Sequence, residues 1–235
     1  MKNILARGGI EFIAVLLGIS GSLWIENNKE LAEINKQINH SLIALSSSLK
    51  SDKQIIENAI ESYEKNKVHF EFIQNIDSVK KATNSRLQKA FERTGVPGTI
   101  NLDATIFNSM ESSGLIYKIE NETLRNTILK VYQKYYLIIA QLNDYDLNTI
   151  QKMDDVVLEN FILSNKTIMW NLDYNHSSTR NNIINNQLYQ NFISANKSNK
   201  AIINNRCKRL LEKVEELLEM INKNIKWNAS GSNKG

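Results

Sequence analysis

The chain is poor in the residues that tie or turn a polypeptide. Its 235 residues include one cysteine, one proline and nine glycines. A single cysteine, Cys207, excludes an internal disulfide framework and a cysteine-based zinc site. So few turn-forming residues argue against sandwiches, barrels and propellers, which need many tight turns. The sequence therefore predicts an all-α protein.

Charge is neither scarce nor concentrated. The formal net charge is +4 and charged residues make up 23% of the chain, an ordinary share for a globular protein. The basic residues are scattered, whereas a nucleic-acid-binding surface needs a cluster of them. We therefore expect no nucleic-acid partner. The 32 asparagines, with many isoleucines and lysines, have A/T-rich codons and suggest a bacterial source.

Catalytic motifs are also lacking. The chain contains no GxSxG, HExxH, GxxxxGK[ST] or GxGxxG pattern. His40 and His69 are expected far apart on one helix, while His176 and Asp173 could meet in a loop without a third metal ligand. We expect no enzyme activity, no cofactor and no metal site.

Three other groups have an ordinary structural explanation. The tyrosines at 132, 135 and 136 are expected to pack in a helix seam, and Cys207 to act as a small apolar residue on a helix stripe. An acidic stretch is expected to be a solvated helix face, because it lacks the glycine of a calcium loop. Its members are Asp144, Asp146, Asp154, Asp155 and Glu159.

A long apolar run is present at the start of the chain. Residues 8–25 contain one charged side chain, Glu11, and would span about 27 Å as a helix, close to the thickness of a bilayer core. Trp24 lies near the end of the run, where an indole prefers the membrane interface. Lys2 and Arg7 precede the run, so the positive-inside rule predicts a cytoplasmic segment 1–7.

Other interpretations of this run remain open. A cleaved signal peptide could use the small residues 20–22, and a buried core helix would require the rest of the protein to cover it. Glu11 either lies at the membrane boundary beside Arg7, or is an intramembrane polar residue that contacts a neighbouring span or lines a pore.

Small residues form a ridge on the predicted span. Ala14, Gly18 and Ser22 are four residues apart, with Gly21 beside them. Such ridges allow close approach of transmembrane helices, so we expect them to form a contact in a homo-oligomer.

Helical spacing continues after the span. One seam, at Leu31, Ile34, Ile38, Leu42, Leu45, Leu49, Ile56, Ile60 and Tyr63, predicts a single helix to about residue 75. A second seam, at Leu124, Ile128, Val131, Tyr135, Ile139, Leu142, Ile150, Met153 and Val157, predicts a helix capped by Asn121 that ends near residue 164. A third, at Leu188, Phe192, Ile202, Leu210, Val214, Leu217, Ile221 and Ile225, predicts a final helix over about 182–227.

Breaks separate these long helices. Residues 95–98 (GVPG) are the strongest break, a short helix is expected to end at Gly114, and the asparagine-rich residues 165–186 are expected to be a loop. The fold prediction is a transmembrane helix that continues into an elongated antiparallel helical bundle or coiled coil. Its parts are a cytoplasmic segment 1–7, a span 8–25, an extracytoplasmic bundle 26–227 and a polar tail 228–235.

Two stretches carry a family resemblance. They are residues 9–27 (GIEFIAVLLGISGSLWIEN) and residues 108–119 (NSMESSGLIYKI) followed by 121–132 (NETLRNTILKVY). The chain resembles a family of uncharacterised bacterial single-span membrane proteins of the Bacteroidetes type, although residues 24–27 depart from the family's usual exit from the span. The resemblance implies a membrane-anchored helical protein and no particular activity.

The resulting functional expectation is a non-enzymatic scaffold or assembly component. It would sit in a bacterial inner membrane with its main domain in the periplasm, self-associate in the bilayer, and contact other membrane proteins. Two alternatives stay open: an oligomeric ion channel or channel accessory subunit with Glu11 facing the path, and an extracytoplasmic sensor that works through a partner.

Overall fold

The described chain is almost entirely helical. A computed structural model describes the backbone of residues 2–164 and 172–231, and the side chains in those ranges except 2–12, 14 and 226–231. Within these ranges there is no β-strand, only an isolated bridge between Leu163 and Leu172. The prediction of an all-helical fold is confirmed.

One very long helix begins the fold. Helix α1 (Lys2–Gln74) runs for 73 residues, and its end agrees with the predicted end near residue 75. Asn75 stops it and starts the next helix, since its side-chain oxygen accepts a hydrogen bond from the Ser78 N–H at 2.9 Å.

Shorter and longer helices alternate along the rest of the chain. In chain order they are α2 (Ile76–Lys81), α3 (Asn84–Thr94), α4 (Thr105–Ser112), the 3₁₀ turn η1 (Leu115–Lys118), α5 (Glu122–Lys130), the π-helical segment η2 (Val131–Tyr136), α6 (Leu137–Asn160), α7 (Ser177–Asn185) and α8 (Gln187–Gly231). Residues 95–104, here called the strap, join α3 to α4 without helical structure.

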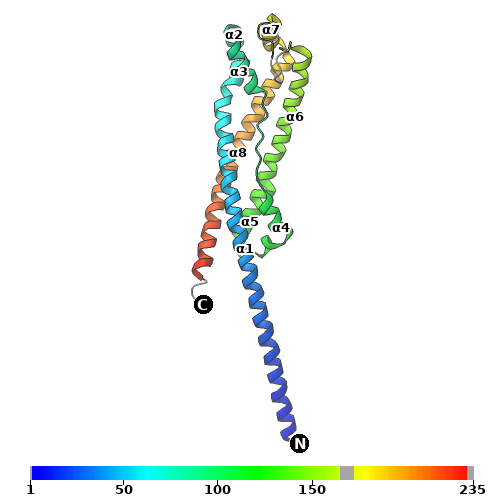
Figure 1. The fold of residues 1–235 in the computed structure, drawn as a ribbon, viewed down its shortest axis with the longest axis vertical. Helices are drawn as coiled ribbons and strands as arrows, with labels where there is room; N and C mark the ends of the chain where they lie inside the picture. The colour runs from blue at the N-terminus through cyan, green and yellow to red at the C-terminus, as the bar shows by residue number, and fades with distance from the viewer. Residues whose placement is uncertain (1, 165–171, 232–235) are drawn as a thin grey trace.

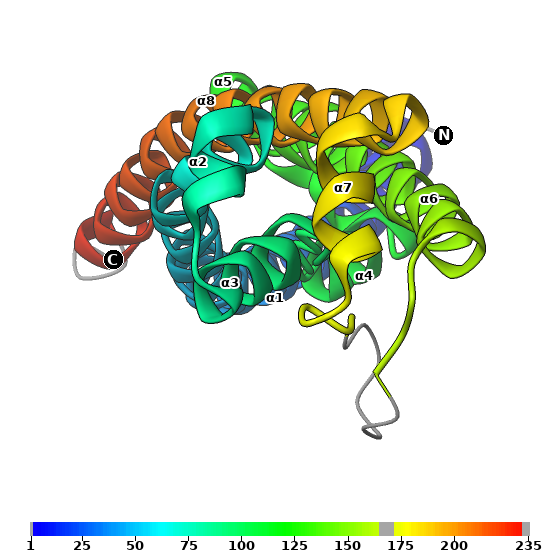
Figure 2. The same cartoon turned by 90° about the horizontal axis from the view of Figure 1, so that it is seen from above.

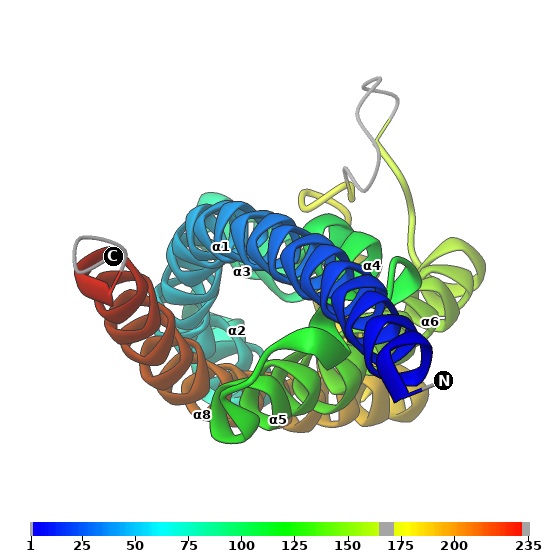
Figure 3. The same ribbon diagram turned by 90° about the horizontal axis from the view of Figure 1, so that it is seen from below.

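The long helices lie side by side. Helix α8 makes its most extensive contacts with α1 and contacts α6 as well, and Figure 1 shows the three along the long axis with the strap beside them. Figures 2 and 3 look along that axis from its two ends and show α1, α6 and α8 around a common centre. The first part of α1 extends alone beyond the other elements (Figure 1).

Two apolar cores lie along this axis. One contains Leu42 and Leu49 of α1 with Leu210 and Val214 of α8, and the other contains Phe70 and neighbours from α2, α3, α6, α7 and the start of α8. The long helices pass through both cores. The segments between the cores are more polar, and they hold the site described below.

Local differences from the predictions have physical causes. Residues 177–185 of the expected loop form α7, where the His176 side chain accepts from the Ser178 N–H and caps the helix. Residues 165–171 of that loop lie outside the described chain. Helix α8 reaches Gly231, so the expected polar tail begins helically.

The predicted α8 seam was wrong in its first part. Leu188 and Ile202 are exposed, whereas Tyr189, Ile193 and Ile203 are buried. The buried face of α8 is therefore shifted by one residue from the predicted one. Asparagines occupy the core positions between Ile193 and Ile203, so the positions of the apolar residues alone predicted the wrong helix face. The later seam residues, from Leu210 to Ile221, are buried as predicted.

No helix in the part of the chain described here is both long enough and apolar enough to cross a bilayer. The predicted span runs partly through residues 8–12 and 14, whose side chains lie outside the description.

Candidate functional site

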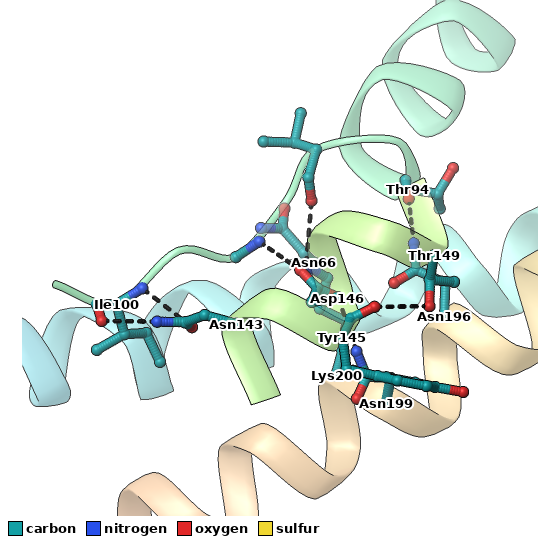
Figure 4. A network of polar contacts seen from close by, with 12 residues as sticks. Asn66, Thr94, Ile100, Asn143, Tyr145, Asp146, Thr149, Asn196, Asn199 and Lys200 are labelled. Atoms are coloured by element: carbon teal, nitrogen blue, oxygen red, sulfur yellow. Dashed lines mark hydrogen bonds and ion pairs between the residues drawn. The ribbon is translucent and has the colours of Figure 1, made fainter. Parts of the chain in front are cut away.

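Side chains of the long helices α6 and α8 hold the strap and the residue before it in place. Asn196 of α8 donates to the Thr94 carbonyl at 2.7 Å, just before the strap begins. Asn143 of α6 accepts from the Ile100 N–H and donates to the Ile100 carbonyl, at 3.3 and 2.8 Å. An irregular segment needs such partners because it has no helical hydrogen bonds of its own. Figure 4 shows these contacts.

Asp146 of α6 is the centre of a polar layer that also contains Asn143 of α6 and Asn196, Asn199 and Lys200 of α8. Its carboxylate is 1% exposed and accepts from the Gly98 N–H at 2.8 Å, the Asn199 amide at 3.0 Å and the Lys200 ammonium at 2.5 Å. Lys200 also donates to the Val96 carbonyl at 3.1 Å. One carboxylate therefore joins α6, α8 and the strap (Figure 4).

Burial and the neighbouring carboxylate shift the pKa of Lys200 in opposite directions. Burial lowers the pKa of its ammonium, and the neighbouring Asp146 carboxylate partly restores it. The two side chains are 13% and 1% exposed, so their ion pair is shielded from solvent. Such a pair must stay together, because either charge alone would be buried without compensation.

A pocket of about 430 Å³ opens between α1, α8 and the strap. Its apolar wall includes Ile55 and Phe70 of α1 and Ile203 of α8, and its polar wall includes Asn66 and Asn204. Arg93 lies at its exposed rim, and Lys200 and residues 96–100 of the strap also line the pocket. This size and mixture are typical of small-molecule sites.

An ionic cluster borders the pocket on α1 and α8. Glu64 accepts from Asn204 at 3.3 Å, Lys208 at 3.2 Å and Lys67 at 2.8 Å. The hydrogen bonds from the two lysines hold the pKa of the Glu64 carboxyl at about 2. Glu64 therefore stays ionised and keeps the Asn204 amide group in one orientation.

His69 lies near this region with an unfavourable environment for a charge. Burial lowers the pKa of its imidazole, and the positive charges of Arg86, Lys89 and Arg93 lower it further. We therefore expect a neutral imidazole at pH 7. The three basic residues belong to α3, and one of them, Arg93, also lines the pocket.

The residues predicted to act in the membrane lie far from the pocket on α1. The side chains of Glu11 and Ala14 lie outside the described part of the chain. A Cβ atom placed on Gly18 or Gly21 would meet nothing within 4 Å, and the Ser22 hydroxyl donates to the Ile19 carbonyl at 2.9 Å. The ridge contact and the role of Glu11 stay predictions.

The predicted tyrosine packing has an added polar feature. Tyr132 is stacked on Phe107 with ring centroids 4.5 Å apart, and Tyr136 donates to the buried Asp52 carboxylate at 2.7 Å. Asp52 also accepts from the Asp103 N–H at the end of the strap, at 3.0 Å. These tyrosines lie on the π-helical segment, which the apolar spacing did not predict and which places both Tyr132 and Tyr136 in the core.

Cys207 lies in the helix stripe and lines the pocket. Burial raises the pKa of its thiol to about 12, so the neighbouring basic residues do not create a thiolate. The prediction that it packs as an apolar residue is confirmed by its place in the core.

The prediction of a solvated acidic face was wrong for Asp146, which is buried in its ion pair with Lys200. Asp144, Asp155 and Glu159 are exposed, and Asp154 is partly buried. His176 and Asp173 share a turn through a backbone hydrogen bond of 3.1 Å. Among the described residues, no group of three possible ligands is placed to hold a metal ion.

Sequence reasoning missed the buried asparagines. Asn196, Asn199 and Asn204 occupy α8 positions between the apolar anchors Ile193 and Cys207. A signal was present for Asn196 and Asn199, because the predicted seam had no apolar member between Phe192 and Ile202. In a long helix, such a gap filled with amides indicates a polar layer in the core.

Comparison with known proteins gives no relative. The chain matches no protein-family model, no curated protein and no solved structure.

Proposed function

We propose that this chain is a non-enzymatic, membrane-anchored protein that self-associates and serves as a scaffold or assembly component of a membrane complex. The projecting segment of α1, residues 13–25, is the observation that carries the proposal. Leu17 and Trp24 are each 68% exposed there, and large apolar side chains are exposed in every direction around the helix. The full set is Ile13, Val15, Leu16, Leu17, Ile19, Leu23, Trp24 and Ile25.

A helix that is apolar on all sides needs lipid or protein around it to shield it from water. A contiguous apolar surface of this kind marks an interaction with a membrane or another protein, because its exposure to water is energetically unfavourable. The lack of a polar face favours lipid over one packed neighbour. The proposed orientation places residues 1–7 in the bacterial cytoplasm and the helical body in the periplasm.

The proposed body is an elongated antiparallel bundle standing on this anchor. The contacts of α8 with α1 and α6 support the arrangement. Self-association is supported by the open surface at Gly18 and Gly21, where a neighbouring helix could approach closely.

Membrane fractionation tests the anchor. The full chain, expressed in a bacterial host, should stay in the membrane pellet after alkaline carbonate extraction. Leu16→Lys with Leu17→Lys should release it, since each central lysine costs about 2.5–3.5 kcal/mol of insertion free energy. The matched control, Leu188→Lys with Ile202→Lys, changes two exposed apolar residues of the body and should stay in the pellet. A wild-type chain found in the soluble fraction would refute the anchor.

Mass measurement tests self-association. In detergent, light scattering should give a multiple of the 26.9 kDa chain mass. Gly18→Leu should lower that mass, and the control Leu16→Phe, which adds bulk on the opposite face of the projecting segment, should leave it unchanged. A monomeric wild type would contradict the scaffold proposal.

A sensor is the second candidate function. The pocket between α1, α8 and the strap favours it, because a pure scaffold needs no such pocket in its body. In this candidate function the protein signals through a partner protein.

A further inference from the structure

One residue of the pocket lining, Asn204, carries an unpaired hydrogen-bond acceptor. Asn204 is 5% exposed, and its Oδ1 atom has no partner among the described residues. Its amide nitrogen donates to Glu64, which fixes the side chain and leaves the oxygen unused. A buried acceptor without a partner is unfavourable, so a bound N–H or O–H donor would be stabilised here.

The pocket rim has a positive charge and the lining has no negative one. No aspartate or glutamate lines the pocket. Arg93 lies at the rim and makes no ion pair with any described carboxylate, whereas Lys200 is paired with Asp146. An anionic group at the rim would therefore meet an available guanidinium, which suits a carboxylate particularly well.

Much of the remaining wall is apolar. Ile55, Ala59, Phe70, Ile203 and Cys207 contribute to it, and the volume of about 430 Å³ accommodates a molecule of modest size. An aliphatic portion of a ligand could displace water from this surface.

We propose that the pocket binds a small organic carboxylate with an aliphatic body and one N–H or O–H donor. The carboxylate contacts Arg93, the donor bonds to Asn204 Oδ1, and the aliphatic portion contacts the apolar wall. The proposal gives the sensor candidate a ligand class and does not depend on the membrane anchor.

Three related probes test this recognition on the full chain in detergent. N-acetyl-L-leucine has all three features, N-acetyl-L-leucine amide lacks the negative charge, and 4-methylpentanoate lacks the N–H donor. Calorimetry or ligand-observed NMR should give a dissociation constant of about 1 mM or tighter for the first probe. Each of the other two should bind about tenfold more weakly, because each leaves one protein group unpaired.

Single-residue variants test which side chain makes each proposed contact with the probes. Arg93→Met should weaken N-acetyl-L-leucine about tenfold and leave the amide probe unchanged, while Lys89→Met, one turn earlier on α3, should change neither. Asn204→Val should weaken N-acetyl-L-leucine and leave 4-methylpentanoate unchanged. Ala59→Leu should block all three probes by filling the pocket. Circular dichroism checks that each variant is folded.

Several outcomes would overturn the proposal. They are the absence of N-acetyl-L-leucine binding to the wild type, equal affinities for the three probes, and equal effects of Arg93→Met and Lys89→Met. Membrane fractionation is a separate measurement, so failure of this ligand class and failure of the anchor are distinguishable.

Discussion

Asp146→Asn is the most informative perturbation of the polar layer. The wild-type carboxylate holds Gly98, Asn199 and Lys200. Asparagine keeps the shape and one acceptor oxygen but removes the charge that compensates the buried ammonium. Breaking a buried ion pair costs about 3–5 kcal/mol, and the slight exposure of Lys200 places the expectation near the lower value, about 3 kcal/mol.

Urea unfolding of the full chain, followed by circular dichroism at pH 7, measures this cost. The matched control is Asp144→Asn, which removes the same charge from an exposed position on α6 and should change the unfolding free energy by less than about 0.5 kcal/mol. Lys200→Met alone should also destabilise, since it leaves Asp146 without its cation.

The double variant completes the test. Asp146→Asn with Lys200→Met removes both charges and should cost less than the sum of the single changes, by about 1.5 kcal/mol or more. The reasoning is refuted if Asp146→Asn costs no more than Asp144→Asn, or if the single costs simply add.

Three further predictions follow from buried polar groups. Tyr136→Phe removes the 2.7 Å hydrogen bond to Asp52. It should lower the unfolding free energy, measured by thermal melts, by about 1–3 kcal/mol and raise the pKa of the Asp52 carboxyl. An unchanged melting temperature would contradict this prediction. Burial raises the pKa of the Cys207 thiol to about 12. At pH 8 the thiol should therefore react with iodoacetamide at least about a hundredfold more slowly in the folded chain than in the unfolded chain. Equal rates in the two states would contradict this prediction. Burial and the neighbouring Asp155 raise the pKa of Asp154 from 3.8 to about 6. Between these two pH values the folded chain holds a proton on Asp154 that the unfolded chain has lost. The protonated carboxyl therefore stabilises the fold at low pH, and this contribution is lost as the pH rises from 3.8 through 6. Asp154→Asn should therefore flatten the pH dependence of stability in that window, and an NMR-measured pKa near 3.8 would contradict the argument.

The long apolar seams made the main helices predictable. All α1 seam residues from Ile38 to Ile56 are buried, and the helix ends at Gln74, next to the predicted end near residue 75. Asn121 caps α5 as predicted, accepting from the Leu124 N–H at 3.0 Å. These features depend on residues close together in sequence, so local patterns are sufficient to find them.

The polar layer was not predictable in the same way. Asp146 and Lys200 are 54 residues apart, and each resembles an ordinary surface charge within its own helix. Their burial depends on the packing of α6 against α8, which local spacing does not specify. The same applies to Asn204, whose place in the pocket lining depends on a wall supplied by α1.

The unbroken course of α1 has a mechanical consequence. Pocket residues Ile55 to Phe70 and the projecting segment belong to one helix, and about 30 residues, or about 45 Å, separate Ile55 from Ile25. A helix without a proline or glycine over that distance behaves as a stiff rod. A small rotation of the rod where it borders the pocket would therefore turn its far end through a comparable angle, in the same direction and without a hinge to absorb it.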